Sequence, residues 1–351
     1  MRTYTVEEVL NQKDFLLVDV RSPEEYREDT IPTAINMPIL DNEERKEIGY
    51  LYKQVDPFVA KRKGLEIATK KLTNFYDFVL EKQKEYKQII FFCYRGGTRS
   101  MSVAQNLSML GLKAGYLKGG YKNYRTFVLR ELPLLVQDIK LIGLQGLTGI
   151  GKTKILIDLE EKNIPILDLE YYAQNSGSAF GNIVYSENGY PSQKKFESLL
   201  YYALLKQKSK YYFVECESKR IGRVMQPEYF YDKLQEASRI LLSTSIENRV
   251  SNVLIDYVKP NETENKPMIL KAINSLNKRL GKDKTEKLCK CIETDNYEEV
   301  IATLMIDYYD PLYIHKIEED RPFIAEIEFD EISEATNQLI EIMNKILKEE
   351  E

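Results

Sequence analysis

Histidine and tryptophan are nearly missing from this chain: His315 is its single histidine, and it has no tryptophan. A Ser-His-Asp or Cys-His catalytic pair is not expected, because His315 lies far along the sequence from every other candidate residue. The same scarcity excludes a zinc site rich in histidine. Chemistry is therefore expected to use a cysteine, carboxylate, arginine and lysine side chains, or the phosphate of a bound substrate.

Cysteine is also scarce, and long apolar runs are missing. Four cysteines, at positions 93, 216, 289 and 291, do not form a disulfide framework in a chain of 351 residues. Cys289 and Cys291 have poor spacing for a metal site, and no second pair completes four ligands. No apolar run approaches the ~20 residues that span a bilayer. We therefore expect no structural metal site built from cysteine or histidine, no membrane segment, and a reducing, cytoplasmic location.

The charge of the chain gives only a weak indication of its partners. The formal net charge is −5, which gives no indication of nucleic-acid binding. The local distribution of charge, however, sets the field at a binding surface. Basic clusters occur at Lys194-Lys195, at Lys219-Arg220 with Arg223, and at Lys278-Arg279. Such clusters are usually solvated faces, so none of them identifies a partner alone.

A cysteine followed by a Gly/Arg loop forms the first candidate site, Cys93-Tyr94-Arg95-Gly96-Gly97-Thr98-Arg99-Ser100. Ile89 to Phe92 predicts a buried strand before it, and Ser100 to Leu110 predicts a helix after it, with Val103, Leu107 and Leu110 on one face. Arg95, Arg99 and the helix N-terminus should lower the pKa of the thiol. Gly96 and Gly97 let backbone amides point inward around a thiolate, a persulfide or an oxyanion.

A P-loop forms the second candidate site, Gly146-Leu147-Thr148-Gly149-Ile150-Gly151-Lys152-Thr153. A strand over 139–144 precedes it and a helix over 154–159 follows, which is the context that the motif requires. The expected phosphate-binding residues are Gly146, Thr148, Gly149, Gly151, Lys152 and Thr153. Glu215 or Glu217, at the end of a later strand, could complete a Mg²⁺ site with Thr153 or position a water.

These elements predict an α/β protein in three parts. A domain over 1–132 has strands at 15–20, 89–92 and 114–117, alternating with helices as in a parallel sheet. A P-loop domain over 133–230 has further strands at 166–169 and 211–215. Residues 231–351 are expected to be mainly helical and associated with the P-loop domain. The last helix should pack Ala335, Leu339, Ile342, Met343 and Ile346 in the core.

The first domain resembles a rhodanese domain. The resemblance is carried by residues 19–26, by residues 31–38, by the Cys93 loop and by Gly119-Gly120-Tyr121. A rhodanese domain followed by a P-loop domain is similar to the tRNA 2-selenouridine synthase family. Further motifs agree with that family: Glu44-Arg45, Gly49, Tyr52-Lys53-Gln54, Gly177-Ser178, Phe180-Gly181, Pro191-Ser192-Gln193, Phe196-Glu197, Glu217-Ser218, Arg220-Ile221-Gly222, Tyr308-Tyr309-Asp310-Pro311 and Tyr313.

The resemblance implies an enzyme that modifies the wobble uridine of tRNA. It implies geranylation of 2-thiouridine with geranyl diphosphate, then replacement of the S-geranyl group by selenium from selenophosphate. Cys93 would be the essential cysteine, Lys152 would lie at the diphosphate site, and no cofactor would be tightly bound. Contacts to substrate or tRNA are expected from Ser178, Phe180, Gly181, Ser192, Gln193, Glu215, Glu217, Ser218, Arg220 and Arg223.

The chain departs from the family pattern at several positions. Tyr94 stands where tryptophan often follows the cysteine, and Asn175-Ser176 stands where His-Arg is expected. Tyr190 replaces an expected glutamine, and Cys216 replaces an aspartate between the two glutamates. The loss of His-Arg removes a phosphate or tRNA contact, and Cys216 weakens the Mg²⁺ interpretation of that strand end.

Two other functions fit part of the sequence. Five residues separate Cys93 from Arg99, and Ser100 follows, which also fits the loop of a cysteine phosphatase or a sulfurtransferase. A phosphatase has no use for the P-loop. A non-catalytic rhodanese-like scaffold fused to a nucleotide sensor is the second alternative, and it has no need for an intact Cys93. Tight tRNA binding would argue against both.

Overall fold

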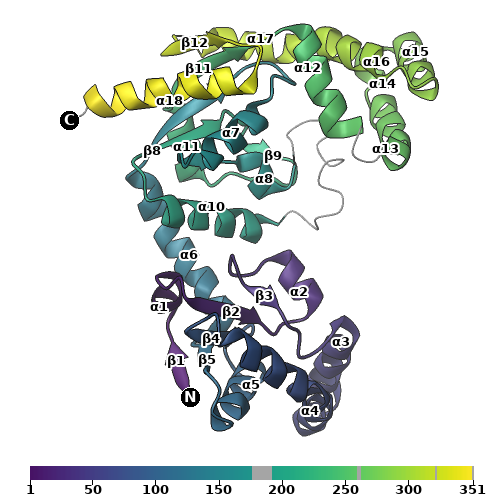
Figure 1. Cartoon of the computed structure of the whole chain (residues 1–351). Helices are drawn as coiled ribbons and strands as arrows, with labels where there is room; N and C mark the ends of the chain where they lie inside the picture. The colour runs from purple at the N-terminus through teal and green to yellow at the C-terminus, as the bar shows by residue number, and fades with distance from the viewer. Residues whose placement is uncertain (176–191, 259–261, 321, 350–351) are drawn as a thin grey trace. The chain divides into compact units, whose positions relative to one another are not determined.

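The computed structural model describes residues 1–175, 192–258, 262–320 and 322–349 (Figure 1). The chain divides into two compact units, each treated by itself below. Unit 1 comprises Met1–Leu132 with Lys194–Tyr202, and unit 2 comprises Pro133–Gln193 with Ala203–Glu351. Over the residues searched, no helix is long and apolar enough to cross a membrane.

Unit 1 is built on a five-stranded sheet with the order β1-β5-β4-β2-β3. All of its neighbouring strands are parallel. The strands are β1 (Arg2–Tyr4), β2 (Phe15–Asp19), β3 (Ile35–Asn36), β4 (Gln88–Phe92) and β5 (Ala114–Leu117). The central strand β4 is buried from Ile89 to Phe92, as its apolar run predicts, and Cys93 follows it directly.

Capped helices connect the strands of unit 1. They are α1 (Val6–Leu10), α2 (Pro23–Glu28), α3 (Asn42–Tyr50), the π-helix η1 (Leu51–Val55), α4 (Pro57–Lys82), α5 (Thr98–Met109) and α6 (Gly120–Gln137). Ser22 caps α2, with Pro23 in the first turn. The helix over 100–110 is confirmed, but Leu110 is not on its buried face. Leu110 is the C-cap of α5 and is 60% exposed.

The second part of unit 1 comes from a distant segment. Lys194–Tyr202, part of α10 (Gln193–Gln207), belongs to unit 1 although it lies within the region expected to form the P-loop domain. Glu197 forms an ion pair with Arg125, and the Ser198 hydroxyl donates to the Asp29 carboxylate over 3.0 Å. Tyr121 donates to the same carboxylate over 2.6 Å. These buried polar contacts fix the segment on α6.

Unit 2 is built on a second five-stranded parallel sheet, with the order β12-β11-β6-β8-β7. The strands are β6 (Lys140–Gln145), β7 (Ile166–Leu167), β8 (Tyr211–Glu215), β11 (Ser238–Ser243) and β12 (Ala325–Glu328). β9 (Arg220–Ile221) and β10 (Val224–Met225) form a small antiparallel pair. The mainly helical C-terminal region therefore also supplies β11 and β12, which sequence patterning missed.

Helices cover this sheet and extend beyond it (Figure 1). The helices nearest the sheet are α7 (Lys152–Glu161), α8 (Leu169–Ala173), α11 (Glu228–Gln235) and α18 (Ile332–Glu349). A separate helical core is formed by α12 (Ile246–Val253), η2 (Leu254–Val258), α13 (Glu262–Ser275), α14 (Asn277–Leu280), α15 (Lys282–Glu293), α16 (Tyr297–Leu304) and η4 (Met305–Tyr309). The helix α17 (Asp310–Glu319) follows η4 directly.

The predicted fold class is confirmed: two parallel α/β sheets are followed by a mainly helical region. Ala335, Leu339 and Met343 of α18 are buried in the core of the second sheet, and Ile342 and Ile346 pack against it. In both units a candidate site follows the carboxyl end of an interior strand, where folds of this kind hold ligands.

Candidate functional site

Cys93 is held at the end of β4 by the turn that leads into α5. Its side chain is 3% exposed. The Ser100 hydroxyl donates to the Cys93 sulfur over 3.2 Å. The sulfur is also 4.0 Å from the Gly97 carbonyl oxygen. The first turn of α5 therefore surrounds the sulfur with polar groups, as the Gly/Arg loop predicted.

These surroundings favour the thiolate form of Cys93. Burial alone would raise the pKa of the thiol, but the side-chain and backbone hydrogen bonds from Ser100 and the charge of Arg99 outweigh it. The pKa of Cys93 therefore lies below its ordinary value. By contrast, burial raises the pKa of Cys216 to about 11 and also raises that of Cys289. Cys93 is thus set apart as a reactive thiol.

Arg99 is fixed by a carboxylate on a neighbouring helix. Its guanidinium donates to Glu25 of α2 over 2.9 Å, and Arg45 of α3 lies 3.6 Å from the same carboxylate. Burial would raise the pKa of Glu25, but its bonds to Arg99 lower it. Arg95 is exposed, and no ion pair of its side chain occurs in the part of the chain that the structure describes. Of the two predicted cations, Arg99 is the one that lowers the pKa of the thiol.

Two glycines allow the thiol loop to pack closely. Gly96 has φ +61, and a Cβ there would lie 2.5 Å from the Leu117 carbonyl oxygen. Gly120, with φ +58, lies against the backbone of Cys93 and Gly96. Gly97 is different, because a Cβ there would meet no heavy atom within 4 Å. Its lack of a side chain leaves open space beside the thiol loop.

The P-loop connects β6 to α7 in unit 2, as predicted. Gly151 precedes α7 with φ +88, a left-handed conformation that favours glycine. Lys152 follows at the first position of the helix, and its Nζ donates to the Gly146 carbonyl over 3.3 Å. The backbone N–H groups at the start of α7 and the Lys152 ammonium form the kind of cradle that binds phosphate.

Three glutamates gather beside the P-loop threonine. The Thr153 hydroxyl is 3.0 Å from Glu215 Oε1 and 3.4 Å from Glu170 Oε2. Glu170, Glu215 and Glu217 each offer an oxygen within 4.8 Å of the others. The second oxygen of Glu215 is buried without a hydrogen-bond partner in the part of the chain that the structure describes. Hard oxygen ligands of this kind suit Mg²⁺.

The glutamates hold their protons tightly in this arrangement. Burial raises the pKa of Glu170 to about 8, and the charge of Glu217 adds to the effect. Burial also raises the pKa of Glu215 well above its ordinary value, helped by Glu170, and raises that of Glu217. Lys152 opposes all three shifts. A bound divalent cation would favour the ionised forms in the same way.

Residues from two later helices hold the P-loop from the other side. Arg249 of α12 is buried and donates through Nε to the Thr148 carbonyl over 2.8 Å. Its guanidinium also pairs with Asp310 of α17, with Nη1 at 2.9 Å. Asn252 donates to the Gly149 carbonyl over 3.0 Å. The α12 and α17 helices therefore fix the conformation of the phosphate loop.

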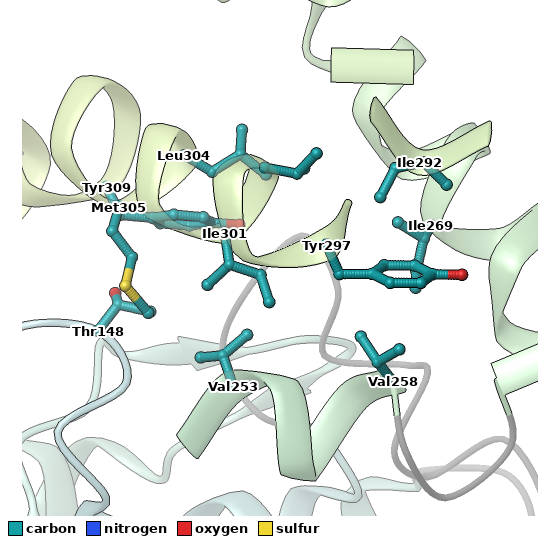
Figure 2. Close-up of a pocket in the computed structure, with 11 residues that line it drawn as sticks. Thr148, Val253, Val258, Ile269, Ile292, Tyr297, Ile301, Leu304, Met305 and Tyr309 are labelled. Carbon is teal, nitrogen blue, oxygen red and sulfur yellow. The ribbon is translucent and has the colours of Figure 1, made fainter. Parts of the chain in front are cut away.

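An apolar cavity of about 70 Å³ adjoins the P-loop (Figure 2). Thr148 lies at one end beside Met305, and Tyr297, Ile269 and Ile292 lie at the other. Thr148 and Val253 also line the P-loop pocket, which has a volume of about 320 Å³. The phosphate loop therefore opens onto both a polar pocket and an apolar cavity in the helical part of unit 2.

Comparison with known proteins identifies the family of the chain. A family model described as the tRNA 2-selenouridine synthase AAA domain matches residues 139–343, and a rhodanese-like domain model matches residues 3–126. The tRNA 2-selenouridine synthase of Nitrosomonas europaea is 30% identical over 88% of this chain and 90% of that protein. The chain belongs to the tRNA 2-selenouridine synthase family.

A second relative agrees with this assignment, and one solved structure is also similar to part of the chain. The tRNA 2-selenouridine synthase of Shewanella pealeana is 31% identical over 87% of this chain and 89% of that protein. The crystal structure of the N-terminal domain of a putative ATP/GTP binding protein from Clostridium difficile 630 is 41% identical. It covers 36% of this chain and 99% of that domain, with a TM-score of 0.36.

The other contacts predicted from the family motifs have different surroundings. Glu215, Glu217 and Ser218 line the P-loop pocket. The Gln193 amide bonds both backbone groups of Met225, over 2.8 and 3.0 Å. Arg220 and Arg223 are exposed at the β9–β10 pair, and Ser192 is half-buried. Ser178, Phe180 and Gly181 lie outside the described residues, as do Ser176 and Tyr190.

Two residues at the P-loop were missed by sequence reasoning. Glu170 lies in α8, after the short strand β7, and Arg249 lies about a hundred residues after the loop that it holds. The position of Glu170 could have been predicted from the sequence. It follows β7 closely, and the carboxyl ends of β7 and β8 meet at one edge of a parallel sheet. Arg249 had no such signal. Its partner Asp310 belongs to a family motif, and the contact gives that motif a structural role.

Proposed function

We propose that this chain converts 2-thiouridine to 2-selenouridine at the wobble position of tRNA. The sulfur is first geranylated with geranyl diphosphate, and the S-geranyl group is then replaced by selenium from selenophosphate. Relatives that carry the printed name tRNA 2-selenouridine synthase, at about 30% identity over nearly nine-tenths of the chain, support the overall activity. A tRNA substrate in turn supports a cytoplasmic location.

The main structural support for the two-step reaction is that the P-loop pocket and the apolar cavity share lining residues. Thr148 and Val253 line both spaces, so a ligand can have its phosphates at Lys152 and an apolar chain directly beside them. The P-loop pocket of about 320 Å³ lies in the range of ~300–1,000 Å³ usual for small-molecule sites. Inorganic phosphate has no apolar part to place in this cavity, whereas a prenyl diphosphate has both parts, and a volume of about 70 Å³ accommodates the first few carbons of its chain.

In the first step the sulfur of 2-thiouridine attacks carbon 1 of geranyl diphosphate. A carbon–sulfur bond forms, the carbon–oxygen bond to the diphosphate breaks, and the uridine loses the proton on its ring nitrogen. Lys152 and the P-loop amides stabilise the charge that develops on the diphosphate leaving group. Thr153, Glu170, Glu215 and Glu217 would hold Mg²⁺, which when bound supplies further positive charge beside that diphosphate.

In the second step selenium replaces sulfur at carbon 2 of the base. The carbon–sulfur bond breaks, geranylthiol leaves, and a carbon–selenium bond forms. Water then releases phosphate from the selenium. No oxidant or reductant is needed, because selenium in selenophosphate is already at the selenide level and sulfur leaves as a thiol. In this exchange the Cys93 thiolate, favoured by its lowered pKa, attacks carbon 2 and expels geranylthiol, and the selenium of selenophosphate then displaces the Cys93 sulfur from carbon 2 and regenerates the thiolate.

Nucleoside mass spectrometry on purified components tests this function. Protein, tRNA containing 2-thiouridine and geranyl diphosphate should give S-geranyl-2-thiouridine, and added selenophosphate should convert it to 2-selenouridine. A reaction without geranyl diphosphate is the control and should give neither product. Formation of 2-selenouridine at full rate in that control would contradict the geranyl step, and failure to form either product would contradict the whole proposal.

A further inference from the structure

An exposed group of aromatic and basic residues surrounds the turn between α3 and α4 of unit 1. Tyr50, Tyr52 and Phe58 are 64%, 57% and 76% exposed. Lys53, Lys61 and Arg62 lie among them and are also exposed. These six residues are called the α3–α4 surface below. We propose that the α3–α4 surface binds unpaired nucleotides of the tRNA substrate, an inference that rests on the proposed function for the identity of the RNA.

Local structure fixes the aromatic side chains at this turn. Tyr50 ends α3, Tyr52 belongs to η1, and Asp56 ends η1 and caps α4. The Asp56 carboxylate accepts from the backbone N–H of Phe58 over 2.7 Å, which fixes Phe58 in the first turn of α4. Several large aromatic side chains grouped on a solvent-exposed surface indicate a binding site, because such groups are usually buried.

The charge at this turn is opposite to that of the whole chain. Residues 50–71 contain six basic residues (53, 61, 62, 63, 70 and 71) and two acidic residues (56 and 66), a net +4 against −5 for all 351 residues. Three of these cations are paired: Arg62 with Glu66, Lys63 with Glu47 and Lys71 with Glu44. Lys53, Lys61 and Lys70 form no ion pair in the part of the chain that the structure describes. The Lys61 ammonium lies 5.2 Å from the centre of the Phe58 ring. Unpaired cations beside exposed rings are suited to phosphates and bases respectively.

The α3–α4 surface is connected to the reactive thiol through one helix. Arg45 of α3 lies 3.6 Å from Glu25, and Glu25 accepts from Arg99 of the thiol loop. Tyr50 is five residues further along α3, a rise of about 7.5 Å. The α3–α4 surface therefore lies on the same helix that is ion-paired through Glu25 to the thiol loop.

RNA fits this surface better than a protein partner does. A protein interface is depleted in lysine at its centre, whereas here exposed Lys53 follows Tyr52 in the sequence and Lys61 lies over the Phe58 ring. Aromatic stacking accepts any base because every base has a flat face, so it can hold a loop without reading its sequence. We infer that this surface holds the loop while other residues select the reacting uridine.

Binding of a labelled RNA hairpin tests the inference. The probe is a fluorescein-labelled stem-loop with the sequence of a tRNA anticodon arm, and the competitor is a duplex of the same stem without the loop. Anisotropy titrations would compare the full-length chain with the triple variant Tyr50→Ala, Tyr52→Ala, Phe58→Ala. The matched control is Met109→Ala with Leu110→Ala, which removes exposed apolar side chains elsewhere in unit 1.

We expect the triple variant to bind the stem-loop at least about tenfold more weakly, because the bases can no longer stack on the three rings. Its affinity for the duplex and that of the control should change little. Lys53→Gln with Lys61→Gln should lower the salt dependence of binding by about one unit for each phosphate that these lysines bind. Circular dichroism would confirm that each variant is folded.

Three results would overturn the inference: an unchanged affinity in the triple variant, an equal loss of affinity for stem-loop and duplex, or a triple variant with fewer subunits than the wild-type protein. The last would identify the α3–α4 surface as a protein interface. Binding is measured without catalysis, so it is independent of the modification assay. A wild-type protein that makes no 2-selenouridine but binds as expected would contradict the proposed function alone.

Discussion

The hydroxyl oxygen of Ser100 lies 3.2 Å from the sulfur of Cys93. The two residues are seven positions apart and meet because α5 begins at Thr98 and turns back toward the end of β4. Ser100 is fully buried, so its hydroxyl cannot exchange this contact for water. A hydrogen bond to the charged form of a group favours that form, and here the favoured form is the thiolate.

Ser100→Ala should therefore raise the pKa of Cys93. The thiolate is the species that reacts with iodoacetamide, so the curve of alkylation rate against pH should move to higher pH. At neutral pH the rate should fall several-fold. Ser102→Ala is the matched control, because the Ser102 hydroxyl bonds only carbonyl groups of its own helix. Superimposable curves for Ser100→Ala and the wild type would contradict this role.

Substitutions at Arg99 and Glu25 should move the same curve in opposite directions. Arg99→Ala removes a cation that favours the thiolate, so the pKa of Cys93 should rise. Glu25→Gln removes a negative charge while keeping an oxygen for Arg99, so the pKa should fall. Alkylation against pH measures both effects in one assay. Shifts in the same direction would mean that Glu25 acts only by holding the loop in place.

Cys93→Ser should abolish formation of 2-selenouridine while the protein stays folded. A hydroxyl at neutral pH is a far weaker nucleophile than a thiolate, and the substitution is nearly isosteric. Cys216→Ser is the control, since the Cys216 thiol keeps its proton at neutral pH. Nucleoside analysis of the treated tRNA gives the readout. Product at the wild-type rate from Cys93→Ser would remove Cys93 from the mechanism.

Lys152→Ala should separate the two steps of the reaction. The variant loses the cation beside the diphosphate leaving group and should not form S-geranyl-2-thiouridine. Given tRNA that is already geranylated, it should still form 2-selenouridine with selenophosphate. Lys162→Ala is the control, because Lys162 follows the last residue of α7 and pairs with Asp158. Normal geranylation without selenium transfer would instead assign selenophosphate to the P-loop.

Filling the apolar cavity should block the prenyl chain. Ile301→Phe adds bulk among the lining residues and should reduce geranylation at least about tenfold, while diphosphate still competes for the P-loop. Ile306→Phe is the control, because Ile306 is exposed on the adjoining helix. Initial rates with geranyl diphosphate and inhibition by diphosphate would be measured on both. Equal rates for the two variants would show that the chain is bound elsewhere.

Asp310→Ala should destabilise unit 2 by about 3–5 kcal/mol, because it leaves the buried Arg249 guanidinium without its partner. Asp307→Ala removes the partner of Lys284 at the surface and should cost ~1 kcal/mol or less. Urea unfolding monitored by circular dichroism would compare the two variants. Similar losses of stability would mean that the Arg249 pair does not support the P-loop.

Both candidate sites could be located from the sequence because each depends on a contiguous segment. The thiol loop and the P-loop are each eight residues long and lie directly between a strand and a helix. Their geometry is set by local backbone conformation and by the first turn of the following helix. Buried strands such as β4 and β8 could also be predicted from the sequence, because their apolar runs are short and bounded by polar residues.

The parts that were missed depend on contacts between distant segments. The helical spacing of three and four residues predicted that Leu110 lies on the same buried face as Val103 and Leu107. The helix α5 ends one residue before Leu110, so Leu110 faces water. β11 was read as part of a helical region, because its short apolar run looks the same in a strand and a buried helix. Arg249 shows no local signal at all, since its role exists only once α12 and α17 meet the P-loop.

The contribution of Lys194–Tyr202 to unit 1 has a consequence for synthesis of the chain on the ribosome. Tyr202 is made 70 residues after Leu132, the end of the first continuous part of unit 1. At ~5–20 residues per second, this interval is about 4–14 s. Throughout it, Asp29 lacks Ser198 and Arg125 lacks Glu197. Co-translational folding of the domain that carries the thiol therefore cannot finish before the first part of unit 2, Pro133–Gln193 with the P-loop, has been made.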